Sequence, residues 1–436
     1  MAIASGAAMT DTVLATDRPA DVPWWRSLGP GLITGAADDD PSGIATYSQG
    51  GAQFGFDVAW TLLLTFPLMV GIQLASARIG RVTGRGLAEV FAHAWPRAIV
   101  VSLVALLVVA NVINLGADLN AMGDAAALIA GGDGRLYAVM FAALSLALQV
   151  FLSYARYVRL LKWLTLTLFA YVGVAFASHV DWPAALHATV WPHLQGTRDY
   201  VTTVVAILGT TISPYLFFWQ AGQEVEEIRR VPADEPLRTD PRQARAQLRR
   251  LRIDTWVGMG FSNGIAFFMI VATAATLHAH GITDIATTSQ AAQALRPVAG
   301  GFAFALFALG IVGTGLLALP VLAGSAAYAV ASLVPLRRGL DQPLHRARGF
   351  YAILAAAMGV GGVLGTAHVD PMKALYVAAV INALIAVPIM VAVMLAASNR
   401  SIMGDLALPL RWKVPGWLAT VAMAAAGLAM IGTMLH

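Results

Sequence analysis

The sequence contains no cysteine and few charged residues. The lack of cysteine excludes disulfide bonds, thiolate metal ligands and iron–sulfur clusters. Only 12% of the 436 residues are charged, against roughly 25% in soluble domains. Because 58% of the residues are hydrophobic and the mean hydropathy is +0.70, so few charges could not cover the surface of a soluble protein. The composition therefore indicates an integral membrane protein.

Two functional signals are also missing. No phosphate-binding loop of the form G-x-x-x-x-G-K-[ST] occurs, which argues against a membrane ATPase, and no motif predicts an enzyme. Residues 1–21 are polar and rich in alanine, without the apolar stretch of a signal peptide. We therefore expect residues 1–27 to form a disordered cytoplasmic tail.

Long apolar stretches are what the sequence does contain. A helix needs about 20 apolar residues to cross a bilayer, and we predict eleven spans, near residues 30–50, 56–77, 98–117, 136–153, 160–178, 200–223, 254–277, 302–333, 350–366, 374–396 and 414–434. With a cytoplasmic N-terminus, 24 of the 28 basic residues fall in cytoplasmic segments, where Lys and Arg collect. We therefore expect a cytoplasmic N-terminus, an outside C-terminus, a bacterial-type inner (plasma) membrane location and no nucleic-acid partner.

The first span is interrupted by charge. Residues 35–43 read Gly-Ala-Ala-Asp-Asp-Asp-Pro-Ser-Gly, and a charge at membrane depth costs about 2.5–3.5 kcal/mol on insertion scales. Pro41 removes a helix hydrogen bond, and Gly43 permits unwinding. Unwound backbone at this depth lines a cavity or is buried in protein, and its oxygens suit a hard cation. The alternative is a plain loop between two short apolar segments.

The sixth span is interrupted in a similar way, at Gly209-Thr210-Thr211-Ile212-Ser213-Pro214-Tyr215. A lone Ser-Pro pair would more often be a simple kink. The first and sixth spans, however, each open a set of five. Paired interruptions at corresponding positions are typical of inverted-repeat transporters with a substrate site at the midplane.

A longer motif surrounds the first interruption: Asp40-Pro41-Ser42-Gly43-Ile44-Ala45-Thr46, then Gly51-Ala52-Gln53-Phe54-Gly55. It resembles the D-P-G-N-I-A-T and G-A-Q-F-G signature of the natural resistance-associated macrophage protein (NRAMP) family of divalent-metal transporters. The resemblance implies an all-α membrane protein with a LeuT-like fold of about 11 helices, in which helices 1 and 6 are broken. Its first repeat would span 28–178 and its second 199–396, with a cytoplasmic loop at 225–252 and an extra helix at 414–434.

The sequence departs from this family at the expected metal ligands. The resemblance places ligands at Asp40, at an Asn position that is Gly43 here, and at Ala and Met positions that are Thr210 and Ser213 here. The family's histidine is replaced by Tyr215. Losing the thioether removes a ligand that favours soft metals, and losing side-chain ligands leaves room for the waters that Mg²⁺ retains.

The third span departs as well. Of the acidic residues that the family ties to proton movement, only Asp118 remains, and the others align with Asn111 and Ala121. Asn111, Asn114 and Asp118 share one helix face, where they could line the ion path or form interhelical hydrogen bonds. The same alternatives apply to Asn382.

The sequence therefore resembles the NRAMP-related magnesium-transporter branch. We expect import of Mg²⁺, with Mn²⁺ as a plausible substrate, by alternating access and without proton coupling. The expected metal site is Asp40, Gly43, Thr210 and Ser213, and the expected ion path is Asn114, Asp118, Tyr215 and Asn382. We expect no cofactor besides the transported cation, the bilayer as partner, and a monomer.

Three alternative functions stay open at this point. The first is a proton-coupled Mn²⁺/Fe²⁺ importer of the main family type. The second is a LeuT-fold carrier of an organic solute. The third is a metal sensor that binds without transporting.

Overall fold

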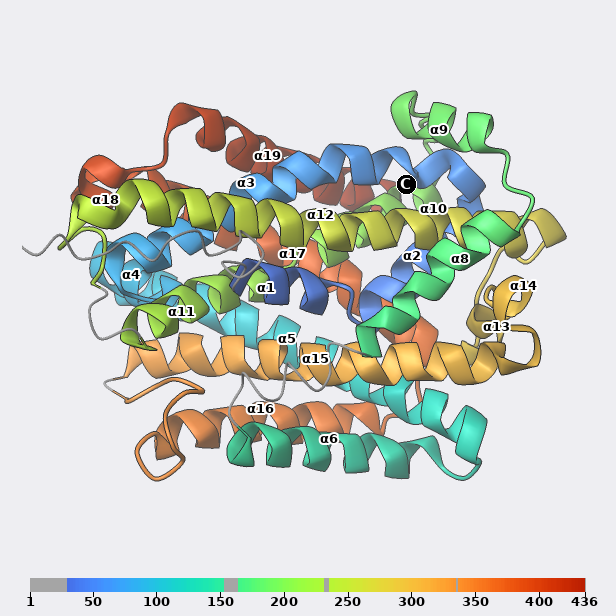
Figure 1. The fold of residues 1–436 in the computed structure, drawn as a ribbon, viewed down its shortest axis with the longest axis horizontal. Coiled ribbons are helices and arrows are strands. Elements are labelled where there is room, and N and C mark those ends of the chain that lie inside the picture. Colours follow the sequence, from blue (N-terminus) through green and yellow to red (C-terminus); the bar gives the residue numbers. More distant parts are fainter. Residues whose placement is uncertain (1–29, 153–163, 231–234, 335, 436) are drawn as a thin grey trace, which may run out of the picture.

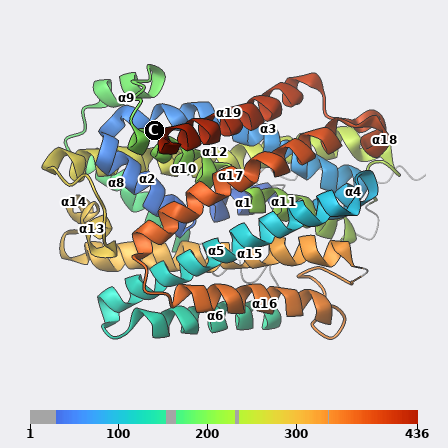
Figure 2. The same ribbon diagram turned by 180° about the vertical axis from the view of Figure 1, so that it is seen from behind.

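The structure, a computed structural model, describes residues 30–152, 164–230, 235–334 and 336–435. Within these ranges it is all helical, without strands. Long helices run side by side across the molecule (Figure 1), and the view from behind shows the same arrangement (Figure 2). The long helices are α3 (Trp60–Thr83), α5 (Arg97–Ala130), α6 (Gly134–Phe151), α12 (Ala244–Thr276), α15 (Ala303–Leu333), α16 (Arg348–Gly365), α17 (Pro371–Ser398) and α19 (Leu410–Leu435).

Two further spans are each built from two shorter helices, as the sequence predicts. The first consists of α1 (Pro30–Asp38) and α2 (Pro41–Phe54), and the other of α10 (Arg198–Thr211) and α11 (Pro214–Arg230). Each second helix begins with proline, whose missing N–H is not needed in the first helical turn. Figure 1 places both breaks in the middle of the bundle.

The eleven predicted spans all have helical counterparts. In the described ranges, nine helices are long and apolar enough to cross a membrane. The second broken span is counted among these nine as Arg198–Arg230, whereas the first, with α1 and α2 of 9 and 14 residues, is not. Of the predicted span at 160–178, the described part comprises a 3-10 helix (Leu164–Leu168) and α8 (Phe169–Ala177). Its beginning, like the predicted tail 1–27, lies outside the described residues.

Short helices gather at the two ends of the bundle. At one end lie α4 (Leu87–Ala94) and α18 (Arg400–Met403), and at the other α9 (Trp182–Val190), α13 (Thr288–Gln293) and α14 (Arg296–Ala299) (Figure 1). We call the first of these the basic end, because the arginines of residues 235–252 lie there. The predicted loop 225–252 is helical at both of its ends, since α11 continues to Arg230 and α12 already begins at Ala244. These extensions are too charged to be recognised from apolar runs.

Glycines allow both broken spans to pack closely on their neighbours. A Cβ atom added to Gly35 of α1 would lie 2.1 Å from the carbonyl oxygen of Gly258 in α12. One added to Gly209 of α10 would lie 2.0 Å from the carbonyl oxygen of Ala379 in α17. Only glycine permits such backbone contact between membrane helices. The helix ends that form the two breaks are thus fixed against continuous helices.

Candidate metal site

Asp40 lies at the first break and accepts four hydrogen bonds. Its Oδ1 accepts from the hydroxyl of Ser42 at 2.6 Å and the backbone N–H of Gly43 at 2.9 Å. Its Oδ2 accepts from Asn114 Nδ2 at 3.0 Å and the Tyr215 hydroxyl at 3.1 Å. The residue is the N-cap of α2, where the helix dipole favours a negative charge. Asp40 is therefore a buried carboxylate on which three elements, α2, α5 and α11, converge.

The C-terminal end of α10 lies directly against α2, the helix that Asp40 caps. The Thr210 hydroxyl is 3.4 Å from that of Ser42, and a Cβ atom added to Gly43 would lie 3.4 Å from Thr210 Oγ1. Thr210 and the ring of Tyr47, 3.3 Å from the same added atom, thus border the position where the family carries Asn. A side chain at this position would require the Tyr47 ring to move by a few tenths of an ångström.

Ser213 lies in the second break, but its hydroxyl points back along the chain. It donates to the carbonyl oxygens of Gly209 at 2.8 Å and Thr210 at 2.9 Å. Carbonyls in the last turn of a helix lack intrahelical partners, so Ser213 satisfies the end of α10. The proton of this hydroxyl is therefore used within α10, and only its oxygen lone pairs are left for a cation.

The polar face of α5 divides between two roles. Asn114 donates to Asp40 and accepts a hydrogen bond from Asn382 Nδ2 of α17 at 3.3 Å. Asn111 instead donates to Ser325 of α15 at 2.7 Å, which is the interhelical alternative. Asp118 lies one turn from Asn114 and is fully buried, and neither of its oxygens accepts a hydrogen bond within the described part of the chain.

A second pair of carboxylates was not assigned a role from the sequence. Asp38 Oδ2 and Asp39 Oδ1 lie 2.5 Å and 3.1 Å from the hydroxyl of Ser262 in α12. One hydroxyl has a single proton and cannot donate fully to both. Asp38 is the last residue of α1 and Asp39 follows it, so both lie at a helix C-terminus, where the helix dipole disfavours negative charge. Sequence reasoning missed Ser262 because one serine in an apolar helix is more often a packing residue.

The breaks together form a strongly electronegative centre. Asp38, Asp39, Asp40 and Asp118 are all at most 1% exposed, and among residues of known placement none of them forms an ion pair with Lys or Arg. The described ranges also contain no group of three or more His, Cys, Asp and Glu side chains arranged to hold a metal ion. A cation bound at Asp40 would therefore be completed by hydroxyls, backbone carbonyls and water.

A cavity of about 600 Å³ opens toward this centre from the end opposite the basic end. Gln49 and Gln53 of α2 line it, together with Asp199 and Asp284. Ala45, one helical turn from Ser42, also lines it. The cavity is a vestibule that approaches the first break along α2.

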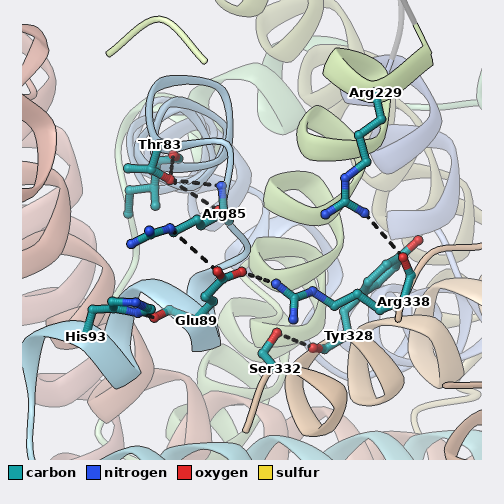
Figure 3. Close-up of polar contacts among 9 residues, drawn as sticks. Thr83, Arg85, Glu89, His93, Arg229, Tyr328, Ser332 and Arg338 are labelled. Carbon is teal, nitrogen blue, oxygen red and sulfur yellow. Dashed lines mark hydrogen bonds and ion pairs between the residues drawn. The ribbon is translucent and has the colours of Figure 1, made fainter. Parts of the chain in front are cut away.

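On the basic end, polar contacts close the bundle (Figure 3). Glu89 of α4 pairs with Arg338 and, at 3.5 Å, with Arg85. Arg229 of α11 donates to the backbone carbonyl of Arg338 at 3.3 Å. The cavity lined by Arg229, Tyr328 and Arg338 measures only about 20 Å³. The structure is thus open at the vestibule, whereas these contacts close the bundle between α4 and α11.

The fold is shared with solved transporters. The crystal structure of the Eremococcus coleocola manganese transporter in complex with an aromatic bis-isothiourea substituted compound matches with a TM-score of 0.75 at 17% identity, covering 97% of this chain and 90% of that one. Mhp1, a nucleobase-cation-symport-1 family transporter, in a closed conformation, matches with a TM-score of 0.54 at 13% identity, covering 94% of this chain and 91% of that one. These likenesses confirm the predicted LeuT-like fold with broken first and sixth spans.

Sequence comparison identifies relatives along nearly the whole chain, and they are transporters, as predicted, and not enzymes. The divalent metal cation transporter MntH of Deinococcus radiodurans is 28% identical over 408 residues, 91% of this chain and 87% of the relative. MntH of Acidiphilium cryptum is 28% identical over 411 residues, 90% of this chain and 87% of the relative. The family model described as natural resistance-associated macrophage protein-like matches residues 31–433. The chain therefore belongs to the NRAMP family and is a multi-pass integral membrane protein.

Proposed function

We propose that this protein transports divalent cations bound at Asp40, and that Mg²⁺ is the ion its site geometry favours. The supporting observation is a set of buried oxygen acceptors without donors near that carboxylate. Both oxygens of Asp118 and Oδ1 of Asn382 accept no hydrogen bond within the described ranges. Waters carried by a partly hydrated cation are donors, and Mg²⁺ usually keeps several waters when it binds to proteins.

The ion would take the place of two hydrogen bonds. Within the described residues, Asp40 Oδ2 accepts hydrogen bonds from Asn114 and Tyr215 alone, whereas Oδ1 accepts from Ser42 and Gly43 in the first turn of α2. On binding, Asn114 and Tyr215 would turn from Oδ2 to the waters of the ion. Oxygen ligands alone, without a thioether or an imidazole, suit hard cations better than soft ones.

The relatives favour a second candidate, Mn²⁺ transport of the main family type. They are called divalent metal cation transporters, and the solved neighbour is a manganese transporter. The buried carboxylates of Asp38, Asp39 and Asp118 also support this candidate, because they could accept protons during the transport cycle. On this reading, transport is coupled to protons, in contrast to the expectation from the altered third span.

Transport of either ion requires alternating access to one central site. The vestibule would admit the ion, and separation of Arg338 from Glu89 would release it at the basic end. With the basic end in the cytoplasm of a bacterial cell, the membrane potential drives entry by about 2.3 kcal/mol per charge per 100 mV.

Flux into proteoliposomes, with a pH-sensitive dye inside, separates these candidates. The first predicts uptake of Mg²⁺ and Mn²⁺ with an unchanged internal pH. The second predicts uptake of Mn²⁺ with acidification and no competition from Mg²⁺. If the Asp40→Ala variant still transports both Mg²⁺ and Mn²⁺ as the wild type does, transport does not pass through the proposed site.

A further inference from the structure

Five arginines surround one cavity at the basic end, outside the metal site. The cavity has a volume of about 540 Å³ and lies between the end of α3, the beginning of α12 and the beginning of α19. We call it the arginine pocket, after Arg78, Arg245, Arg249, Arg252 and Arg411 in its lining. A volume of this size accommodates a small organic group.

The charge of the arginine pocket is not balanced by the protein. No acidic side chain lines it, and none of its five arginines forms an ion pair with residues of the described ranges. Neighbouring arginines are paired: Arg250 contacts Glu224 at 2.6 Å, and Arg230 contacts Glu226 at 3.3 Å. Five positive charges without an acidic partner in the described part of the chain therefore gather around this one cavity, which indicates an anionic ligand.

One of the five guanidinium groups is already held in place. Arg78 donates from Nε to the carbonyl oxygen of Leu406 at 2.7 Å and from its terminal NH₂ to that of Ala407 at 3.4 Å. Guanidinium groups present paired N–H donors that match the oxygens of a phosphate. A preorganised guanidinium among four others suits a phosphate better than a lone carboxylate.

Part of the lining of the arginine pocket is apolar. Apolar walls favour a lipid over a free inorganic anion, because a free anion has no apolar part to place against them. Leu74, Leu248 and Trp412 contribute to the lining. Just beyond it, Val414 and Leu418 of α19 are about half exposed, at 48% and 54%, on a helix that crosses the membrane. Trp412 stands at this transition, and Trp is enriched at the level of lipid headgroups.

We propose that the arginine pocket binds the phosphate headgroup of an anionic phospholipid, whose acyl chains lie on the exposed apolar face of α19. Basic pockets between membrane helices bind anionic headgroups in this way. With the predicted orientation, the lipid belongs to the cytoplasmic leaflet. It joins α12, whose Ser262 contacts the first break, to α3 and α19.

Native mass spectrometry of the full chain released from nanodiscs tests this proposal. Nanodiscs of equal parts phosphatidylglycerol and phosphatidylcholine supply both lipids to the wild type and to Arg245→Gln/Arg249→Gln. Wild type should retain phosphatidylglycerol in preference to phosphatidylcholine. The variant should retain about tenfold less phosphatidylglycerol, since each basic residue near an anionic lipid adds to its attraction.

A matched control removes the same charge elsewhere. Arg242→Gln/Arg346→Gln alters two exposed arginines outside the pocket and should retain phosphatidylglycerol as the wild type does. If both double variants lose phosphatidylglycerol to the same extent, the loss reflects the net charge of the protein and not the pocket, and the proposal is overturned. Displacement of the lipid by millimolar inorganic phosphate would assign the pocket to a free anion and overturn it too. The wild-type lipid preference tests the proposal even if a variant fails to fold.

Discussion

The two broken spans share a backbone plan and differ in chemistry. Each break is followed by a helix that begins with proline, at Pro41 and Pro214. The residue before the first proline, Asp40, caps the helix that follows it. The residue before the second, Ser213, satisfies carbonyls of the helix that precedes it.

This difference suggests that the two breaks contribute separately to the charge of the site and to its choice between cations. The first break carries Asp38, Asp39 and Asp40, whereas residues 209–215 of the second carry hydroxyls and no charge. Substitutions at the first break should therefore decide whether a divalent cation binds. Those at the second should decide which cation binds.

The largest effect is expected from Asp40→Asn. The amide is nearly isosteric but cannot offset a divalent charge, so we expect metal uptake into proteoliposomes to fall at least about hundredfold, as when one partner of a buried charge pair is removed. Asp405→Asn makes the same change at an exposed position and should leave uptake unaltered. Residual uptake of Asp40→Asn close to wild type would mean that the charge of the first break does not hold the ion.

A smaller effect is expected from Asp38→Asn/Asp39→Asn. These carboxylates face Ser262 rather than the donors of Asp40, so they add to the field without contacting the ion. We expect uptake to fall about tenfold, because charges that do not touch the ion still attract it through the weakly screening protein interior. The control Ser262→Ala keeps both charges and should keep most of the uptake. If the double variant is as inactive as Asp40→Asn, the three aspartates act as one unit.

A change of selectivity is expected at the second break. Ser213→Met/Tyr215→His introduces a thioether and an imidazole, which favour softer metals than oxygen does. With these two softer ligands, the ratio of Mn²⁺ to Mg²⁺ uptake should rise by about tenfold or more. Thermal unfolding of the variant checks that the larger Met is accommodated, and Ser401→Met, at an exposed serine, is the control. An unchanged ratio would show that selectivity lies outside this break.

The sequence alone predicts most of the fold, because its two strongest signals are physical requirements of the bilayer. Apolar length defines the spans, and the placement of Asp38–Pro41 and Ser213-Pro214 inside them marks the breaks. The distribution of Lys and Arg between the loops also predicts which side of the membrane each loop faces, and this orientation stays a prediction. The fifth span is the weakest element, and only residues from 164 onward within it are described.

The site is less completely predicted, because sequence motifs identify residues but not their hydrogen-bond partners. The motif identified Asp40, and the third span pointed to Asn114, yet their mutual contact depends on how α5 crosses α2. Ser213 was expected to offer a hydroxyl, which instead bonds its own helix. Ser262 carried no signal, since its role arises only from the packing of α12 on α1.

The smallest effect, from Tyr215→Phe, tests whether the two breaks cooperate at all. Among the described residues, Tyr215 is the one member of the second break that donates a hydrogen bond to Asp40. Removing one such bond costs about 0.5–1.5 kcal/mol, so we expect the apparent affinity for Mg²⁺ to change about two- to tenfold with an unaltered maximal rate.

The direction of that change distinguishes two roles for the hydroxyl. If it serves mainly to hold Asp40 without an ion, its loss frees Oδ2 and tightens Mg²⁺ binding. If it contacts a water of the bound ion, as we propose, its loss weakens binding. Tyr351→Phe removes a tyrosine hydroxyl that donates to the carbonyl of Gln342 at 3.0 Å, remote from the site, and should change neither constant. Weaker binding in Tyr215→Phe alone would establish that the neutral break recognises the hydrated ion that the charged break attracts.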